Sequence, residues 1–419
     1  MTSSYRINYQ LRSHKRDALI EFIKGTMQTS FVLYDEAEIE LPETSQDRGA
    51  LVRSKERYAE IMSGVEKLIN VRDHIEMQKQ GSPEHSRLHR LVPTVSQFFT
   101  PLPLRKAFLL ADAQHTISAR HFVPPSFNDI RRILNTAQVC AIAPTLNLVT
   151  FDGDMTLYDD GKDFQRDSAL VALIIKLLSF NLNVAVVTAA GYTENAEARY
   201  EGRLSGLLEG FAMSSLTNAQ LARFHVLGGE CNFLFQLGED YHLHFVPEEA
   251  YQPESVRTWS QNSEQINAIL DIAQANIQKC IDDMGLSAMV IRKAKAVGLV
   301  PQPGVTILRE ILDEVVLSTQ HHLLRYQRSP SVLQAALPFC CFNGGSDVWV
   351  DIGNKLIGVQ MLQAYLNAKP EETLHVGDQF LSTGNDYATR SSCCTLWIIN
   401  PQETQEALVQ LTDILEKQK

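Results

Sequence analysis

Two aspartates and a threonine alternate with other residues directly after a short apolar run. The run is LNLVTF (146–151), and Asp152, Asp154 and Thr156 follow it. Carboxylates this close together repel one another, and a hard cation with oxygen ligands cancels that repulsion. The residue types and their spacing therefore indicate a site for a divalent cation such as Mg²⁺.

Further polar residues lie at the ends of other apolar runs or shortly after them. They are Thr188, Asp351, Lys355, Asp378, Asn385 and Asp386. Each of them alone is more often structural than functional. Because ligands bind beyond the carboxyl ends of parallel strands, these residues together predict one site at one edge of a sheet.

Strand and helix patterns alternate in the segments that carry these residues. LNLVTF, a helical stretch at 167–180 and the apolar run 182–188 predict a βαβ unit and therefore a parallel sheet. Further buried strands of that sheet are expected at 348–353, 373–378 and 394–399. We therefore predict an α/β fold with a core at 141–195 and 345–419.

The segment between these two halves of the core has a different character. Residues 232–246 predict a hairpin, and 263–285 and 306–325 predict amphipathic helices. Strands and helices inserted into an α/β sheet indicate an α+β cap, which we expect at 196–344.

Residues 1–140 are predicted to be mainly helical. Apolar residues line one side of Ser54–Gln78, facing this chain's own core or a neighbouring subunit. A helix at Ser126–Ala137 is expected, with Ser126 as its cap. We expect this region to mediate oligomerisation or to hold an effector site. The alternative is that its basic groups are solvated at the surface. The effector candidates are His115, Arg120, His121, Arg131 and Arg132.

The composition of the chain argues against several classes of function. The chain has 419 residues and a formal net charge of −11, which argues against nucleic-acid binding through the overall field. No apolar run approaches the roughly 18 residues of a membrane span, so no membrane association is expected. The N-terminus lacks a secretory apolar segment, and the seven cysteines have no CxxC spacing. We expect a cytoplasmic protein with reduced thiols.

Taken together, the motifs resemble those of the haloacid dehalogenase superfamily, in its phosphatase branch. The resemblance rests on FDGDMTLY, VAVVTAA, Lys355 and VGDQFLSTGND, in that order. It implies a Rossmann-like core, Mg²⁺ and an aspartyl-phosphate intermediate. It also implies that the insertion between the second and third motifs is a cap of the C2 type.

The resemblance implies a role for each acidic residue. Asp152 is the expected nucleophile and a metal ligand, and Asp154 the general acid and base, with its backbone carbonyl on the metal. Asp378 is a further metal ligand, and Asp386 holds the metal's water shell. Thr188 and Lys355 are expected to hold the phosphoryl oxygens.

A longer match narrows the resemblance to the IMP-specific 5′-nucleotidase family of fungi and apicomplexans. It rests on FDGDMTLYDDG, VTAAGYTENAEARYEGRL, DVWVDIGNKLIGV and VGDQF. It implies Mg²⁺-dependent hydrolysis of inosine 5′-monophosphate (IMP), activation by ATP at a separate site, and a homotetramer. The residues that read the base stay unassigned. The expected substrate contacts are Thr156, Tyr158, Thr188, Arg199, Asn343, Asp351 and Lys355.

Two alternatives stay open at this stage. A sugar-phosphate phosphatase or phosphomutase of the same superfamily also carries a C2 cap. A catalytically silent scaffold protein would keep the fold but lose one of the first-motif aspartates. Both Asp152 and Asp154 are present, which favours an enzyme.

Overall fold

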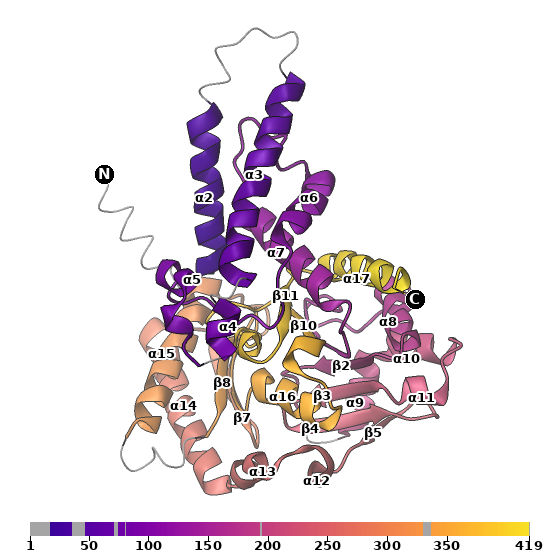
Figure 1. Ribbon diagram of the computed structural model, residues 1–419. Helices are drawn as coiled ribbons and strands as arrows, with labels where there is room; N and C mark the ends of the chain where they lie inside the picture. Colours follow the sequence, from indigo (N-terminus) through magenta and orange to yellow (C-terminus); the bar gives the residue numbers. More distant parts are fainter. Residues whose placement is uncertain are drawn as a thin grey trace.

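A computed structural model gives the arrangement of most of the chain (Figure 1). The predictions for the first residues of the N-terminal region and for Thr193 and Glu194 of the segment VTAAGYTENAEARYEGRL lie outside the described residues. The structure describes residues 17–35, 47–70, 74–79, 81–192, 195–329 and 337–418. No helix in these ranges is both long and apolar enough to cross a bilayer.

The core is one seven-stranded sheet with the order β11-β10-β1-β2-β3-β4-β5. The strands from β11 to β3 in this order pair in parallel, and the β3–β4 and β4–β5 pairings are antiparallel. Phe151 pairs with both Val376 and Val186, so the carboxyl ends of β10, β1 and β2 lie level. The strands are β1 (Leu148–Phe151), β2 (Asn183–Val187), β3 (Phe224–Gly228), β4 (Phe233–Leu237), β5 (Leu243–Phe245), β10 (Thr373–Gly377) and β11 (Cys394–Trp397).

Helices cover both faces of this sheet, because its central strands are apolar on both sides. Val184 and Val186 pack with α8 (Ala169–Ser179) and α17 (Pro401–Glu416). Ala185 and Val187 pack instead with α16 (Lys355–Tyr365), α12 (Glu248–Tyr251) and α13 (Glu254–Ser260). The predicted α/β, Rossmann-like fold class is therefore confirmed. Shorter elements are α9 (Ala196–Arg203), α10 (Ser205–Ala212), α11 (Asn218–Leu221), η4 (Pro370–Glu372) and η5 (Tyr387–Ser391).

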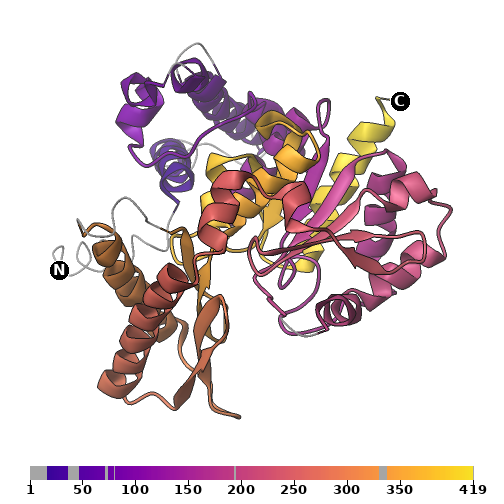
Figure 2. The ribbon, with the colours of Figure 1, turned by 90° about the horizontal axis from the view of Figure 1, so that it is seen from below.

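The cap is a separate antiparallel sheet with two helices on it (Figure 2). Helices α14 (Ser263–Met284) and α15 (Arg309–Gln327) confirm the two predicted amphipathic helices. They bury their apolar faces with the sheet in one hydrophobic cluster. The sheet order is β6-β7-β9-β8, with β6 (Ala288–Arg292), β7 (Ala296–Pro301), β8 (Phe339–Asn343) and β9 (Val348–Ile352).

Two strand assignments, and with them the predicted cap boundaries, are wrong. Strand β9, expected as a parallel core strand, pairs antiparallel with β7 and β8 in the cap. The hairpin β4–β5, expected in the cap, extends the edge of the core sheet. A short apolar run shows that a strand is buried but not in which sheet. The core therefore continues through β5, and the cap sheet continues through β9.

The N-terminal region is helical as predicted and packs on the β11 edge of the core. The Ser126 capping box starts α7, and α7 contributes Ile133 to the N-terminal cluster and Val139 to the core. Tyr58 and Val65 of the predicted stripe are buried in the same chain's cluster, so the stripe faces its own core. The elements are α2 (Ala18–Asp35), α3 (Asp47–Asn70), α4 (His74–Lys79), η2 (Pro83–His85), α5 (Arg87–Leu91), α6 (Leu104–His115) and α7 (Phe127–Ile142).

Candidate active site

Three carboxylates meet at the carboxyl ends of the central strands. Asp152 directly follows β1 and donates its backbone N–H to Val376 of β10. Asp378 follows β10, and Asp386 lies in the next loop. Ligand atoms of the three side chains all lie within 4.8 Å of one another. The topology thus brings together residues that are more than 220 positions apart in the chain.

Lys355 is fully buried against these carboxylates. Its Nζ lies 2.6 Å from Asp152 Oδ1 and 2.8 Å from Asp386 Oδ1, and it donates to Asn385 Oδ1 at 3.1 Å. Burial alone lowers the pKa of Lys355, but the neighbouring carboxylates outweigh it and raise that pKa. All three ammonium donors therefore have acceptors, and the lysine stays charged.

Asp386 is held on both carboxylate oxygens. Oδ1 accepts from Lys355 and lies 3.0 Å from His375 Nε2, while Oδ2 accepts from the backbone N–H of Gln379 at 2.9 Å. Burial raises the pKa of Asp386, but Lys355 and His375 outweigh it and hold that pKa well below its usual range. In this structure Asp386 anchors Lys355, and its predicted contact with metal-bound water stays a prediction.

The remaining two carboxylates fit a divalent cation. Burial raises the pKa of Asp152 to about 7, and burial together with Asp152 raises the pKa of Asp378. Asp378 Oδ1 is buried and has no hydrogen-bond partner among the described residues. Excess negative charge with an unpartnered carboxylate oxygen is the donor set that Mg²⁺ prefers.

Asp154 lies outside the acid cluster. Its Oδ1 accepts from Arg203 at 2.7 Å and from the backbone N–H of Gly161 at 3.0 Å, and the side chain is 35% exposed. Arg203 also stacks over the ring of Tyr158, with 5.0 Å between its Cζ and the ring centroid. The side chain expected to transfer protons is therefore engaged by a guanidinium group here.

A cavity of about 380 Å³ opens over the cluster, between the core and the cap. Among the predicted residues, Asp152, Asp154, Thr188, Asp351 and Asn385 line it. Burial raises the pKa of Asp351 to about 7, against the charge of Lys293. The volume is in the range of small-molecule sites.

Cap residues that sequence reasoning missed also line this cavity. Lys293 lies over the Trp349 ring at 4.2 Å, and the Trp349 indole N–H donates to Asp347 at 2.8 Å. Lys295 donates to Asn232 at 3.0 Å. No sequence signal separated these residues from ordinary strand and turn positions, because their proximity depends on the cap sheet. The cap side of the lining includes Lys293, Lys295, Phe342, Asp347 and Trp349.

Several predicted substrate contacts lie outside the cavity lining, and most of them contact other residues of the chain. Asn343 donates to Asp313 inside the cap at 2.9 Å, and Tyr158 packs in the core against Phe164. Arg199 stacks over Tyr192 at 5.2 Å, and Tyr192 itself lines the cavity. Thr156 is fully buried, and its hydroxyl has no partner among the described residues. None of Asn343, Tyr158, Arg199 and Thr156 is part of the lining.

The three arginines among the predicted effector residues form ion pairs inside the fold. Arg120 holds Asp129, and Arg131 and Arg132 both hold Glu403. Arg131 is 1% exposed, so the alternative of a solvated surface charge is wrong for it. These pairs tie the N-terminal region together and attach it to α17. His121 is exposed, and His115 accepts from Arg120 through its carbonyl oxygen.

Comparisons with known proteins agree with this geometry. A family model described as "IMP-specific 5'-nucleotidase" matches residues 1–408. IMP-specific 5′-nucleotidase 1 of Yarrowia lipolytica is 45% identical over 100% of this chain and 99% of its own length. The Schizosaccharomyces pombe protein of the same name is 40% identical over all of both chains.

Solved structures of Plasmodium falciparum IMP-nucleotidase share the fold. The IMP-bound, N-terminally truncated form has a TM-score of 0.81 and 34% identity, covering 96% of this chain and 98% of its own. The ATP-bound form has a TM-score of 0.76 and 34% identity, covering 98% of this chain and 87% of its own. With the acid cluster, the buried lysine and the cap in place, this chain belongs to the IMP-specific 5′-nucleotidase family of phosphoric monoester hydrolases.

Proposed function

We propose that this protein hydrolyses IMP to inosine and phosphate through a phosphorylated Asp152, in a Mg²⁺-dependent reaction. The observation that carries the proposal is the cluster of Asp152, Asp378 and Asp386 around buried Lys355. Family membership and the IMP-bound relative support the choice of substrate.

The residues divide the reaction into two displacements. Asp152 attacks phosphorus, the bond from phosphorus to O5′ breaks, and Asp154 gives that oxygen a proton. Asp154 then takes a proton from water, which attacks the acyl phosphate and releases phosphate and free Asp152. We expect Thr188, and Lys355 through the N–H group that faces Asp152 here, to hold the phosphoryl oxygens, which stabilises the charge of the transition state.

The same residues offer a place for the cofactor. Asp152 and Asp378 would hold Mg²⁺ through carboxylate oxygens, because the Asp378 oxygen has no other partner among the described residues. When bound, the ion supplies positive charge that offsets repulsion between the carboxylates and the phosphate. Asp386 is already bound to Lys355 and His375, so we expect it to position rather than to ligate directly.

A substrate panel tests this function. We expect phosphate release from IMP with Mg²⁺, much slower release from GMP, AMP and sugar phosphates, and no release after chelation. The measurement is phosphate release at matched concentrations. Comparable rates of phosphate release from AMP and IMP would contradict the specificity for IMP. Faster release from sugar phosphates would favour the alternative, a sugar-phosphate phosphatase. No release from any of these compounds would contradict the proposal that the protein is a phosphatase.

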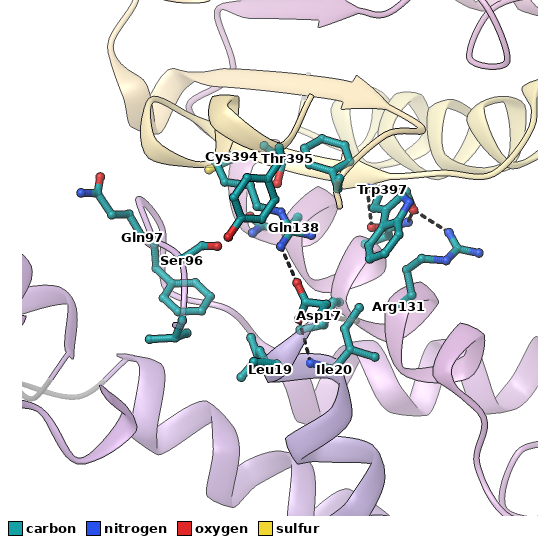
Figure 3. A pocket seen from close by; sticks show the side chains of 18 of the residues that line it. Asp17, Leu19, Ile20, Ser96, Gln97, Arg131, Gln138, Cys394, Thr395 and Trp397 are labelled. Atoms are coloured by element: carbon teal, nitrogen blue, oxygen red, sulfur yellow. Dashed lines mark hydrogen bonds and ion pairs between the residues drawn. The ribbon is translucent and has the colours of Figure 1, made fainter. Parts of the chain in front are cut away.

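We also propose that ATP activates the enzyme from a second cavity, of about 490 Å³, between the N-terminal region and the core (Figure 3). The ATP-bound relative supports an effector. Phe380, Tyr387 and Trp397 offer aromatic surfaces in the lining, and Trp397 donates its indole N–H to the Asp378 carbonyl at 2.9 Å. Of the predicted effector residues, only Arg131 lines this cavity.

Replacing Tyr387 by Ala should weaken the ATP response. Tyr387 is 42% exposed at the cavity, and loss of one aromatic stacking surface should raise the ATP concentration for half-maximal activation about tenfold. Activity without ATP should not change. Phe122→Ala, an aromatic side chain that is 92% exposed, is the control. An unchanged ATP response in the Tyr387 variant contradicts this location.

Two further properties stay proposals that rest on the family resemblance. We propose a homotetramer in the cytoplasm. A molar mass by light scattering near that of one chain, 47.0 kDa, contradicts the tetramer. A tagged protein found in a membrane or secreted fraction contradicts the location.

A further inference from the structure

A buried turn beside the active site carries a carboxyl group that the mechanism above does not use. Glu230 lies between β3 and β4, is 0% exposed and has a backbone φ of +64°. A residue other than glycine is uncommon in this left-handed region. The Glu230 backbone N–H donates to the Thr188 carbonyl at 3.0 Å, and the Gly229 N–H to Ala190 at 2.9 Å. The turn is therefore bonded to the loop that carries Thr188.

The Glu230 side chain reaches Lys355 through one intermediate residue. Asn385 Nδ2 donates to Glu230 Oε1 at 2.9 Å, and Asn385 Oδ1 accepts from Lys355 Nζ at 3.1 Å. Lys355 in turn lies 2.6 Å from Asp152. Glu230 Oε2 is buried and has no hydrogen-bond partner among the described residues.

The chemistry of an amide explains why this contact matters. An asparagine side chain has a donor end and an acceptor end, and a flip exchanges them. With an acceptor at Glu230, the Asn385 oxygen must face the Lys355 ammonium. Without that acceptor, the flipped amide would present its own N–H groups to a positive charge. Lys355 would then lose one of its three acceptors and the restraint on its position.

Glu230 does not need a negative charge for this task. Burial raises its pKa to about 8, against the charge of Lys355, so burial favours the neutral form of the group. A neutral carboxyl group and a primary amide offer the same carbonyl acceptor. The acceptor can therefore be tested separately from charge.

We propose that Glu230 is a positioning residue for the phosphoryl-holding Lys355 and that it acts through the Asn385 amide. This inference rests on the proposed hydrolase function.

The test compares Glu230→Gln with Glu230→Met. Both side chains are uncharged and of similar length, and both residues must adopt the same left-handed backbone conformation, with a φ of +64°. Only Gln keeps the acceptor. We expect kcat for IMP within about threefold of wild type for E230Q and at least ~10-fold lower for E230M, because a hydrogen bond in a network with a charged group is lost. Thermal melting confirms that each variant is folded.

A double-mutant cycle separates positioning through Asn385 from a general structural role. Asn385→Ala alone should lower kcat at least ~10-fold, and adding Glu230→Met to it should change kcat by less than about threefold. If the two substitutions lower kcat by factors that multiply, the contact through Asn385 is contradicted. A kcat of E230M near that of wild type also contradicts the proposal, as does a kcat of E230Q as low as that of E230M. If E230M does not fold, N385A alone tests the proposal. A near-normal kcat of N385A would then contradict it.

Wild-type activity in the same series keeps two failures apart. An inactive wild-type protein contradicts the proposed function itself. An active wild type with an equally active E230M contradicts only the role of Glu230.

Discussion

Replacing Asp152 by Asn is expected to lower kcat for IMP by at least ~10³ while the fold stays intact. An amide of the same shape is not a nucleophile toward phosphorus, whereas its oxygen can still accept from the Gly153 N–H and from Lys355. Phosphate release with saturating Mg²⁺ measures the loss, and circular dichroism checks the fold.

Asp159→Asn is the matched control for this prediction. It makes the same chemical change seven positions along the motif, but Asp159 is 63% exposed and pairs with Lys162. Its kcat should stay within about twofold of wild type, as for most surface substitutions. Near-normal turnover in the Asp152 variant removes Asp152 as the nucleophile. A large loss in the Asp159 variant as well points instead to a general sensitivity of the loop.

The acid cluster could be predicted from the sequence because the positions of its carboxylates depend on the strands of only one sheet. Parallel strands buried on both faces are uniform apolar runs, and their carboxyl ends meet at one edge. Asp152, Thr188 and Asp378 follow such runs and lie at that edge. The first-motif spacing and the order of the other motifs therefore sufficed for the centre of the site.

The edges of the site depend on contacts that no local pattern encodes. VWVDI is as apolar as the core strands, yet β9 belongs to the cap, which brings Trp349 and Asp351 to the cavity from above. Arg203 resembles any helical surface arginine, but it holds Asp154. Glu230 lies in a short turn between two strands, and no local pattern indicates that it is fully buried.

The buried charges also explain a limit of motif reasoning. The motifs predict that Lys355 is a phosphate ligand, but they do not predict its structural role. Here it is the ammonium group shared by Asp152 and Asp386, and Asn385 completes its coordination. Lys355 thus has a structural role among buried carboxylates and a proposed role in catalysis, so its removal should affect both.

Lys355→Met should have the largest combined effect of any single substitution considered for this protein. Removing one partner of a buried ion pair leaves an uncompensated charge, which costs about 3 kcal/mol or more in free energy of unfolding. It also removes a group that we propose to hold the phosphoryl oxygens, so kcat should fall by at least ~10³. Urea denaturation with a chelator present measures the first effect, and phosphate release with Mg²⁺ the second.

The stability loss should grow with pH in a defined window. Burial already raises the pKa of Asp152 to about 7 with Lys355 beside it, and the lysine opposes that rise. Without Lys355 the folded-state pKa of Asp152 goes higher still, while its unfolded-state value stays near 3.8. A carboxyl with a raised pKa makes the fold less stable as pH rises toward that pKa. The deficit relative to wild type should therefore increase from pH 7 upward.

Measuring both proteins at pH 6 and pH 8.5, in roughly equal salt, tests this account because screening is then matched. The deficit of the Lys355 variant should be larger at pH 8.5. Lys295→Met is the control: it removes a cap lysine from the same cavity, where the lysine is bonded to the uncharged Asn232. Its deficit should be small and equal at both pH values. An equal deficit at both pH values for the Lys355 variant would mean that lost packing, rather than uncompensated carboxylate charge, accounts for its instability.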